Sequence, residues 1–137
     1  VTGVQTCALP IYEAAQHGWS ATPDHVGLRR MVTFTDDHDA RRDGVARGKR
    51  ALRTFLEASA GPLPPFAAVL DRPDDDSDQL SNDEFVSGTS EQVAEQLAAQ
   101  ATAIGAQHLM VMFSATDPHE LTEAHDRFAT DVLPRLR

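Results

Sequence analysis

The chain has little that would let it act through thiols or through a basic surface. Its 137 residues include one cysteine, Cys7, and 12 basic residues against 21 acidic ones, which gives a formal net charge of -9. A lone thiol cannot form an internal disulfide, and nucleic-acid binding depends on a basic face that neutralises phosphates. We therefore expect neither a disulfide scaffold nor a nucleic-acid partner.

Long apolar runs are missing as well. No stretch approaches the roughly 18 consecutive apolar residues of a membrane-spanning helix. Hydrophobic residues make up 41% of the chain and charged residues 24%, which is ordinary for a globular domain. A chain of this length can bury one core of its own. The composition indicates a soluble, cytoplasmic protein without membrane contact.

The first eleven residues form a separate problem. Val1–Ile11 resembles the in-frame translation of a sequencing-adapter oligonucleotide. The alternative is a degenerate signal peptide, but the segment lacks a basic start and a long apolar centre. We therefore expect residues 1–11 to be non-native and the native sequence to begin near Tyr12. The native part would then contain no cysteine, because Cys7 lies in the excluded segment.

The rest of the sequence alternates between strand and helix patterns. Strands are expected at His25–Thr35, Phe85–Gly88 and His108–Phe113, and helices at Tyr12–His17, His38–Ser59, Thr89–Ile104 and from Asp117 to Pro134. Residues 60–84, rich in proline and aspartate, are expected to form an irregular surface loop. This alternation predicts an α/β fold with a parallel sheet and right-handed crossovers.

Details within these helices carry further expectations. Asp36 and Asp37 are candidate caps of the helix over 38–59, and Thr89 begins a sequence with capping-box spacing. Gly44 and Gly48 weaken the first of these helices, each by up to about 1 kcal/mol relative to alanine. In the last helix, the expected buried face contains Leu121, Phe128 and Val132.

Four segments together resemble one enzyme family, the luciferase-like flavin-dependent monooxygenases. They are Val32–Arg41 (VTFTDDHDAR), Phe85–Leu97 (FVSGTSEQVAEQL), Ala103–Phe113 (AIGAQHLMVMF) and Phe128–Leu136 (FATDVLPRL). The first is similar to the family's sixth strand and the start of its helix, and the next two to its seventh strand and helix and its eighth strand. The last is similar to its closing helix. The likeness covers roughly residues 26–137, and residues 61–84 fit it poorly.

The resemblance implies a particular fold and cofactor. Residues 12–137 would be the C-terminal part of a TIM-type (βα)8 barrel and would contribute its last three strand–helix units. The whole protein would use reduced FMN, or a deazaflavin, to oxidise a small organic substrate. The resemblance leaves open whether the whole protein is a homo-oligomer, and it implies that the isolated chain is inactive. The alternative is a complete small α/β binding module without catalysis.

Candidate site residues follow from the rule that barrel enzymes act at the carboxyl ends of their strands. Gly88 and Thr89 open a helix, so their backbone N–H groups either face the anionic part of a cofactor or serve as an ordinary helix cap. Phe113 and Ser114 either line a substrate pocket or, for Phe113, fill the core. Phe34 and Thr35 are weaker candidates of the same kind, and the catalytic residues stay unknown.

Other chemistries have no support in the sequence. Arg29 and Arg30 lie inside a strand, where one either pairs with an acid or reaches a ligand, or both are exposed. His119 and His125 are six positions apart, about 240° around a helix, so the two cannot share a metal. The sequence also has no Gly-rich phosphate loop and no Gly-x-Ser-x-Gly elbow. Because no histidines occur at a metal-binding spacing, we expect no metal site.

Overall fold

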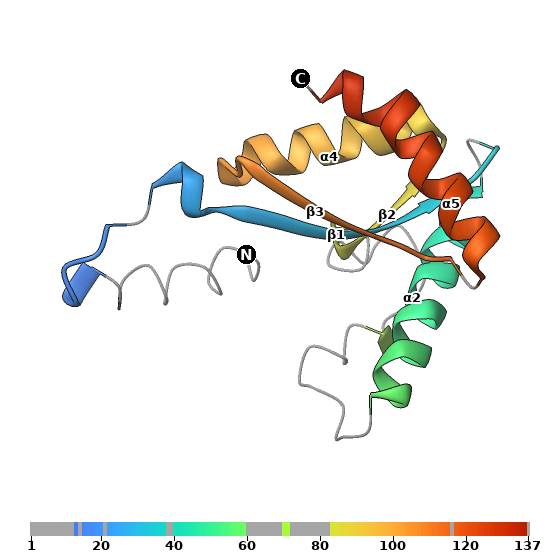
Figure 1. The fold of residues 1–137 in the computed structure, drawn as a ribbon, viewed down its shortest axis with the longest axis horizontal. Coiled ribbons are helices and arrows are strands. Elements are labelled where there is room, and N and C mark those ends of the chain that lie inside the picture. The colour runs from blue at the N-terminus through green and yellow to red at the C-terminus, as the bar shows by residue number, and fades with distance from the viewer. Residues whose placement is uncertain are drawn as a thin grey trace.

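A parallel sheet of three strands forms the centre of the fold, and its first strand lies in the middle (Figure 1). The computed structural model describes residues 13, 15–20, 22–37, 40–59, 70–71, 83–115 and 117–136. Strand β1 (Gly27–Phe34) pairs with β2 (Phe85–Gly88) on one side and with β3 (His108–Phe113) on the other. The prediction of an α/β fold with parallel strands is confirmed.

Some of the sequence predictions fall on parts of the chain that the structure does not describe. The segment 1–11 lies outside the described residues, as does the loop over 60–84 apart from residues 70, 71, 83 and 84. The helix expected before Gly18 is described only near its end, where Gly18 has a φ of 77° and donates its N–H to the carbonyl of Ala15. Gly18 therefore ends this helix, as expected. The short helix η1 (Pro23–His25) then leads into β1.

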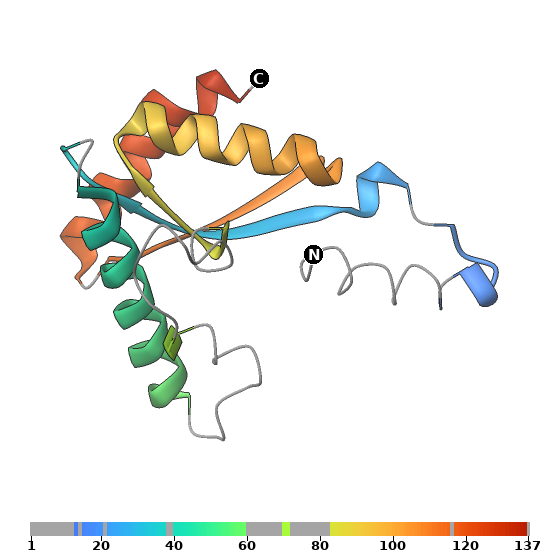
Figure 2. The same ribbon diagram turned by 180° about the vertical axis from the view of Figure 1, so that it is seen from behind.

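Helices cover both faces of the sheet. Helix α2 (Arg41–Ala58) lies on one face, and α4 (Ser90–Ile104) lies on the other (Figures 1 and 2). Helix α5 (Pro118–Arg127) crosses the carboxyl end of the sheet and continues through the π-turn η4 (Phe128–Val132) and the turn η5 (Leu133–Arg135) beside α4.

Alternation along the strands produces two separate cores. Met31 and its register partner Phe85 face α2, whereas Val32 and its partner Val86 face α4. Successive side chains of a strand point to opposite faces, so each strand contributes to both cores. The buried members on the α2 side are Met31, Val45, Leu52, Leu70 and Phe85, and those on the α4 side are Val32, Val86, Val93, Ala94, Leu97 and Val132.

The strand order differs from that of a continuous barrel slice. In a (βα)8 barrel successive strands are neighbours and every helix lies on the outer face, so the second of three strands would be central. Here β3 returns past β2 to pair with β1, and α2 and α4 lie on opposite faces. Two right-handed crossovers that run in opposite directions along a sheet place their helices on opposite faces of it. The described part of the chain is therefore arranged like an open, doubly wound sheet.

Two glycines let α2 approach the sheet closely. A Cβ atom added to Gly44 would collide with the side chain of Ser87, and one added to Gly48 would lie 2.8 Å from Cδ1 of Phe85. Both glycines are buried against the sheet. The cost that glycine imposes on a helix is therefore offset by packing that no larger residue allows.

Two sequence expectations are wrong. Asp36 and Asp37 do not cap α2, because this helix begins at Arg41 and its N-cap, Ala40, makes no side-chain capping bond. Leu121 is 48% exposed, although it was expected on the buried face of the last helix. Phe128 packs against the α4-side core and Val132 is fully buried. Leu121 lies in the first turns of α5, whereas it is the later segment η4, with Phe128 and Val132, that packs against α4.

We predict that Gly44→Ala lowers the free energy of unfolding by about 1–3 kcal/mol, because overpacking outweighs the gain in helix propensity. Urea titration of both proteins measures the difference. Arg50→Ala, at an exposed position of the same helix, is the control and should change stability by less than about 0.5 kcal/mol. A stabilised Gly44→Ala protein would contradict the close packing of α2 on β2.

Candidate functional site

The carboxyl ends of the three strands meet at one edge of the sheet, where α4 and α5 also begin. Two hollows lie at this edge, and Arg127 lines both of them. The first lies between the start of α4 and the C-terminal turns, and the second lies between the ends of β1 and β3. In open α/β sheets ligands bind beyond the carboxyl ends of the strands, most often where the strand order reverses.

The turn formed by Gly88 and Thr89 is a well-made helix cap. Gly88 has a φ of 142°, and a Cβ atom there would lie 2.5 Å from Oε1 of Gln92. The N–H of Thr89 donates to Oε1 of Gln92 at 3.0 Å, and the Thr89 hydroxyl accepts from the N–H of Gln92 at 3.4 Å. Capping, one of the two expected roles, is therefore observed. Because these two groups are engaged with each other, a cofactor contact at Thr89 stays a prediction.

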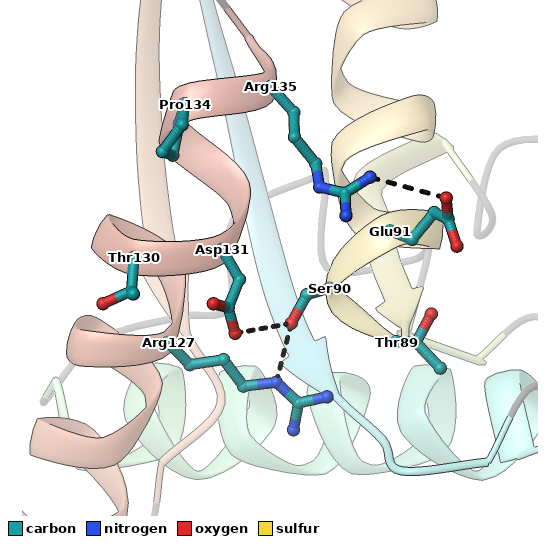
Figure 3. A pocket seen from close by; sticks show the side chains of 8 residues that line it. All are labelled: Thr89, Ser90, Glu91, Arg127, Thr130, Asp131, Pro134 and Arg135. Carbon is teal, nitrogen blue, oxygen red and sulfur yellow. Dashed lines mark hydrogen bonds and ion pairs between the residues drawn. The ribbon is translucent and has the colours of Figure 1, made fainter.

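The first hollow lies directly above this cap (Figure 3). It is an open depression of about 520 Å³ lined by Thr89, Ser90, Glu91, Arg127, Thr130, Asp131, Pro134 and Arg135. This lining contains no lysine. Its positive charge comes from Arg127 and Arg135, and its negative charge from Glu91 and Asp131. Arg135 pairs with Glu91 at 3.4 Å across the depression. The hollow is therefore polar, with no net charge from its lining.

Arg127 holds the edge together through all three nitrogens of its guanidinium group. Its Nε donates to the hydroxyl of Ser90 at 2.9 Å, its Nη1 to Oδ1 of Asp36 at 2.9 Å, and its Nη2 to the carbonyl of Thr35 at 3.1 Å. Its central carbon also lies 4.7 Å from the ring centroid of Phe34. A planar group with several donors suits such a junction better than a lysine would. This residue thus fixes the end of β1 against the starts of α4 and the C-terminal turns.

The second hollow is a smaller crevice of about 210 Å³ between the ends of β1 and β3. Thr33 and Ser114 form its inner wall, and the Thr33 hydroxyl donates to the Ser114 hydroxyl at 2.6 Å. Arg47 of α2 lines one side and donates to the carbonyl of Phe34 at 2.7 Å. Ser114 therefore lines this crevice, while its expected role in a substrate pocket stays a prediction.

A row of hydroxyl groups runs across the sheet beside this crevice. Thr33 is the register partner of Ser87 on one side and hydrogen-bonds Ser114 on the other. The Ser87 hydroxyl is fully buried and has no hydrogen-bond partner among the residues that the structure describes. The row lies beneath Gly44 and Gly48, whose missing side chains make room for it. Buried polar groups are usually satisfied, so this row is an unusual concentration of polarity.

Phe113 lies in the core and does not line either hollow. Its ring is stacked on Phe34 at 6.3 Å and meets Phe128 edge-to-face at 5.7 Å between centroids. These three aromatic residues pack against the α4-side core. Of the two roles expected for Phe113, core filling is the one that its contacts support. Phe34 lines the crevice with its neighbour Thr33, whereas Thr35 is buried and donates its hydroxyl to the carbonyl of Asp37.

The two arginines inside β1 share one carboxylate, far from the carboxyl edge. Arg29 pairs with Glu84 at 2.8 Å, and Arg30 lies 3.9 Å from its other oxygen. Arg30 also donates to Oε1 of Gln100. Burial raises the pKa of Glu84 despite the two guanidinium groups, and burial likewise lowers the pKa of Arg30. The acid-paired interpretation of this arginine pair is therefore the observed one.

Sequence reasoning missed Arg47, Arg127 and Arg135, the arginines that line the two hollows at the carboxyl edge. A signal was present in α5, where Glu120, Ala124 and Arg127 recur at spacings of four and three residues and so share a face. Within the described ranges, the structure has no group of three His, Cys, Asp or Glu residues that could hold a metal ion. None of the helices it describes is long and apolar enough to cross a membrane.

Comparisons with protein-family models, curated proteins and solved structures find no match to this chain. The fold and the geometry of the carboxyl edge therefore carry the functional argument. They define a parallel α/β unit with two polar hollows at the ends of its strands.

We predict that Glu84 makes stability depend on pH. A carboxyl group whose pKa is raised in the folded state favours folding while protonated, and this contribution is lost as the pH rises through the folded pKa. The stability of the wild type relative to Glu84→Gln should therefore fall as the pH rises from about 4, the ordinary pKa of a glutamate, towards neutral pH. Urea titrations across this range measure the difference. A difference that rises with pH would mean that the arginines dominate over burial.

Proposed function

We propose that the chain is part of a flavin-dependent oxidoreductase, with the phosphate of FMN bound at the depression above the start of α4. The single observation that carries this proposal is the depression itself. There the first turn of α4 meets Arg127 and Arg135 beside the Gly88–Thr89 cap. Helix N-termini and arginines are the groups that bind phosphate most readily in proteins. The resemblance to luciferase-like monooxygenases supplies the identity of the cofactor, FMN or a deazaflavin.

The depression suits the phosphate end of a flavin and not its ring. Its lining consists of hydroxyl, carboxylate and guanidinium groups, with Pro134 as its one apolar side chain. Glu91 would repel a dianion unless it remained paired with Arg135, and Asp131, which contacts the neutral hydroxyl of Ser90, would repel it in either case. A flat apolar surface for the isoalloxazine would have to come from residues outside those described. The proposed role of this chain is therefore binding, while the flavin supplies the redox chemistry.

In this proposal the chain supplies the last three strand–helix units of a larger barrel that oxidises a small organic substrate. Barrel closure would require β3 to leave β1 and pair with β2, because successive strands are neighbours in a barrel. The edge of β1 that β3 now occupies would then receive a preceding strand. The pairing of β3 with β1 gives the edge of β1 a partner that its backbone N–H and C=O groups otherwise lack.

We predict that the isolated chain binds FMN weakly and does not turn it over. Fluorescence titration should show FMN binding that Arg135→Gln weakens about threefold to tenfold, and riboflavin, which lacks the phosphate, should not respond to this substitution. Arg50→Gln, an exposed substitution on α2, is the matched control. Sustained flavin-dependent oxidation by the isolated chain, or equal binding of FMN and riboflavin, would contradict the proposal.

A second candidate function is a complete, non-catalytic α/β binding module, and the strand order favours it. The order β2-β1-β3 with helices on both faces is self-consistent, because both crossovers can be right-handed and both faces of β1 are covered. Such a sheet places its crevice between β1 and β3, where the second hollow lies. This candidate requires no upstream strands.

The two candidates predict different solution behaviour. A barrel segment exposes apolar surface and strand edges that the rest of the barrel should cover, such as Met110 of β3, which is 62% exposed. It should therefore bind a hydrophobic dye and self-associate in sedimentation experiments. A module should be monodisperse and unfold in one cooperative transition. Met110→Gln should suppress dye binding in the first case and change little in the second.

A further inference from the structure

Helix α5 turns a charged face toward the carboxyl edge of the sheet and an apolar residue away from it. Glu120, Glu123, Ala124 and Arg127 line the crevice between β1 and β3, while Leu121 is 48% exposed. Helices at a sheet normally turn their apolar face toward it, so a charged face lining the edge of the sheet is unusual. The small side chain of Ala124 leaves space between the acidic and the basic part of the face.

The inner end of the crevice is a cluster of hydrogen-bond donors. The Ser114 hydroxyl accepts from Thr33, which leaves its own proton available to donate into the crevice. Arg47 and Arg127 flank it. The hydrogen bonds that each guanidinium group makes to protein groups use only some of its five N–H groups. Two guanidinium groups and a hydroxyl donor suit an anionic oxygen pair, such as a carboxylate.

The outer end of the crevice has the opposite character. Glu123 lies there with 70% of its side chain exposed and contacts the ring nitrogen of His119 at 3.6 Å. Glu120 lies one turn earlier on the same face. Along α5 the charge therefore changes from negative at Glu120 and Glu123 to positive at Arg127, which lies about 10 Å from Glu120 and about 6 Å from Glu123 along the helix axis. A ligand that spans the crevice meets cations at one end and anions at the other.

We infer that this crevice binds a small zwitterion, with its carboxylate held by Arg47, Arg127 and Ser114 and its ammonium group facing Glu120 and Glu123. The volume of about 210 Å³ supports a compound of amino-acid size. Pockets for drug-sized ligands measure about 300–1,000 Å³, so a flavin ring is too large for this crevice. The inference names the substrate class of the proposed oxidoreductase. The oxidation of the zwitterion rests on the proposed oxidoreductase function, whereas its binding in the crevice does not.

The test is titration of the isotopically labelled full chain, without flavin, with glycine, β-alanine and 4-aminobutanoate, followed by amide NMR shifts. The best of these zwitterions should bind at least about tenfold more tightly than acetate or methylammonium, because only a zwitterion satisfies both ends. Its shifts should centre on the crevice residues, among them Ser114 and Ala124. Equal binding of acetate and the zwitterions would overturn the inference.

Two substitutions separate the two ends of the site. Arg47→Gln should weaken zwitterion binding at least about tenfold. Glu123→Gln should weaken it about threefold, since 70% of the Glu123 side chain is exposed and solvent screens its charge. The matched controls Arg50→Gln and Glu95→Gln are exposed changes of the same charge on α2 and α4 and should bind like the wild type. The amide spectrum of each variant reports whether it is folded. Unchanged binding by a folded Arg47→Gln protein would also overturn the inference.

The result is independent of the flavin experiment. Zwitterion binding without any FMN binding would remove the proposed oxidoreductase function and leave a zwitterion-binding module. FMN binding with no zwitterion binding would leave the proposed function standing and overturn the present inference. Acetate and zwitterions that bind alike at the depression above α4 would show that the phosphate site, and not the crevice, recognises the anion.

Discussion

The structure depends above all on the pairing of β1 along both of its edges. Strand β1 pairs with β3 from Gly27 to Val32 and with β2 from Met31 to Phe34, so every residue of β1 has a neighbouring strand and both edges are paired at Met31 and Val32. A peptide group buried without a partner costs about as much as a lost hydrogen bond. The central position of β1 therefore fixes the order of the strands, and the strand order fixes the faces that the helices cover.

The layers follow from this central strand and from alternation along it. Val32 belongs to the α4-side core together with Val93 and Leu97. Met31 belongs to the α2-side core together with Val45 and Leu52. On the α2 side the packing is close because Gly44 and Gly48 carry no side chains. The same closeness brings α2 and its Arg47 next to the ends of β1 and β3, where the crevice forms.

Polar groups gather at the carboxyl edge because three elements end or begin there. Arg127 bonds to Thr35 and Asp36 after β1 and to Ser90 at the start of α4, two segments that lie far from it and from each other along the sequence. The row of hydroxyls that includes Thr33 and Ser87 continues this polarity into the interior. An edge of this kind holds its shape through hydrogen bonds more than through apolar packing, which suits a surface that exchanges water for a polar ligand.

The sequence by itself determined the strands, the ends of most helices, and two local devices. The capping box at Thr89 and the glycine stop at Gly105 are set by residues within one helical turn, so local sequence is enough to predict them. It also placed Ser114 at the carboxyl edge, where the crevice lies, because the ends of parallel strands share one edge. Only the tertiary structure decided which strand is central, that Asp36 bonds Arg127 and does not cap α2, and that Leu121 faces solvent. Those outcomes depend on which surfaces meet across the fold, and local periodicity carries no information about such long-range contacts.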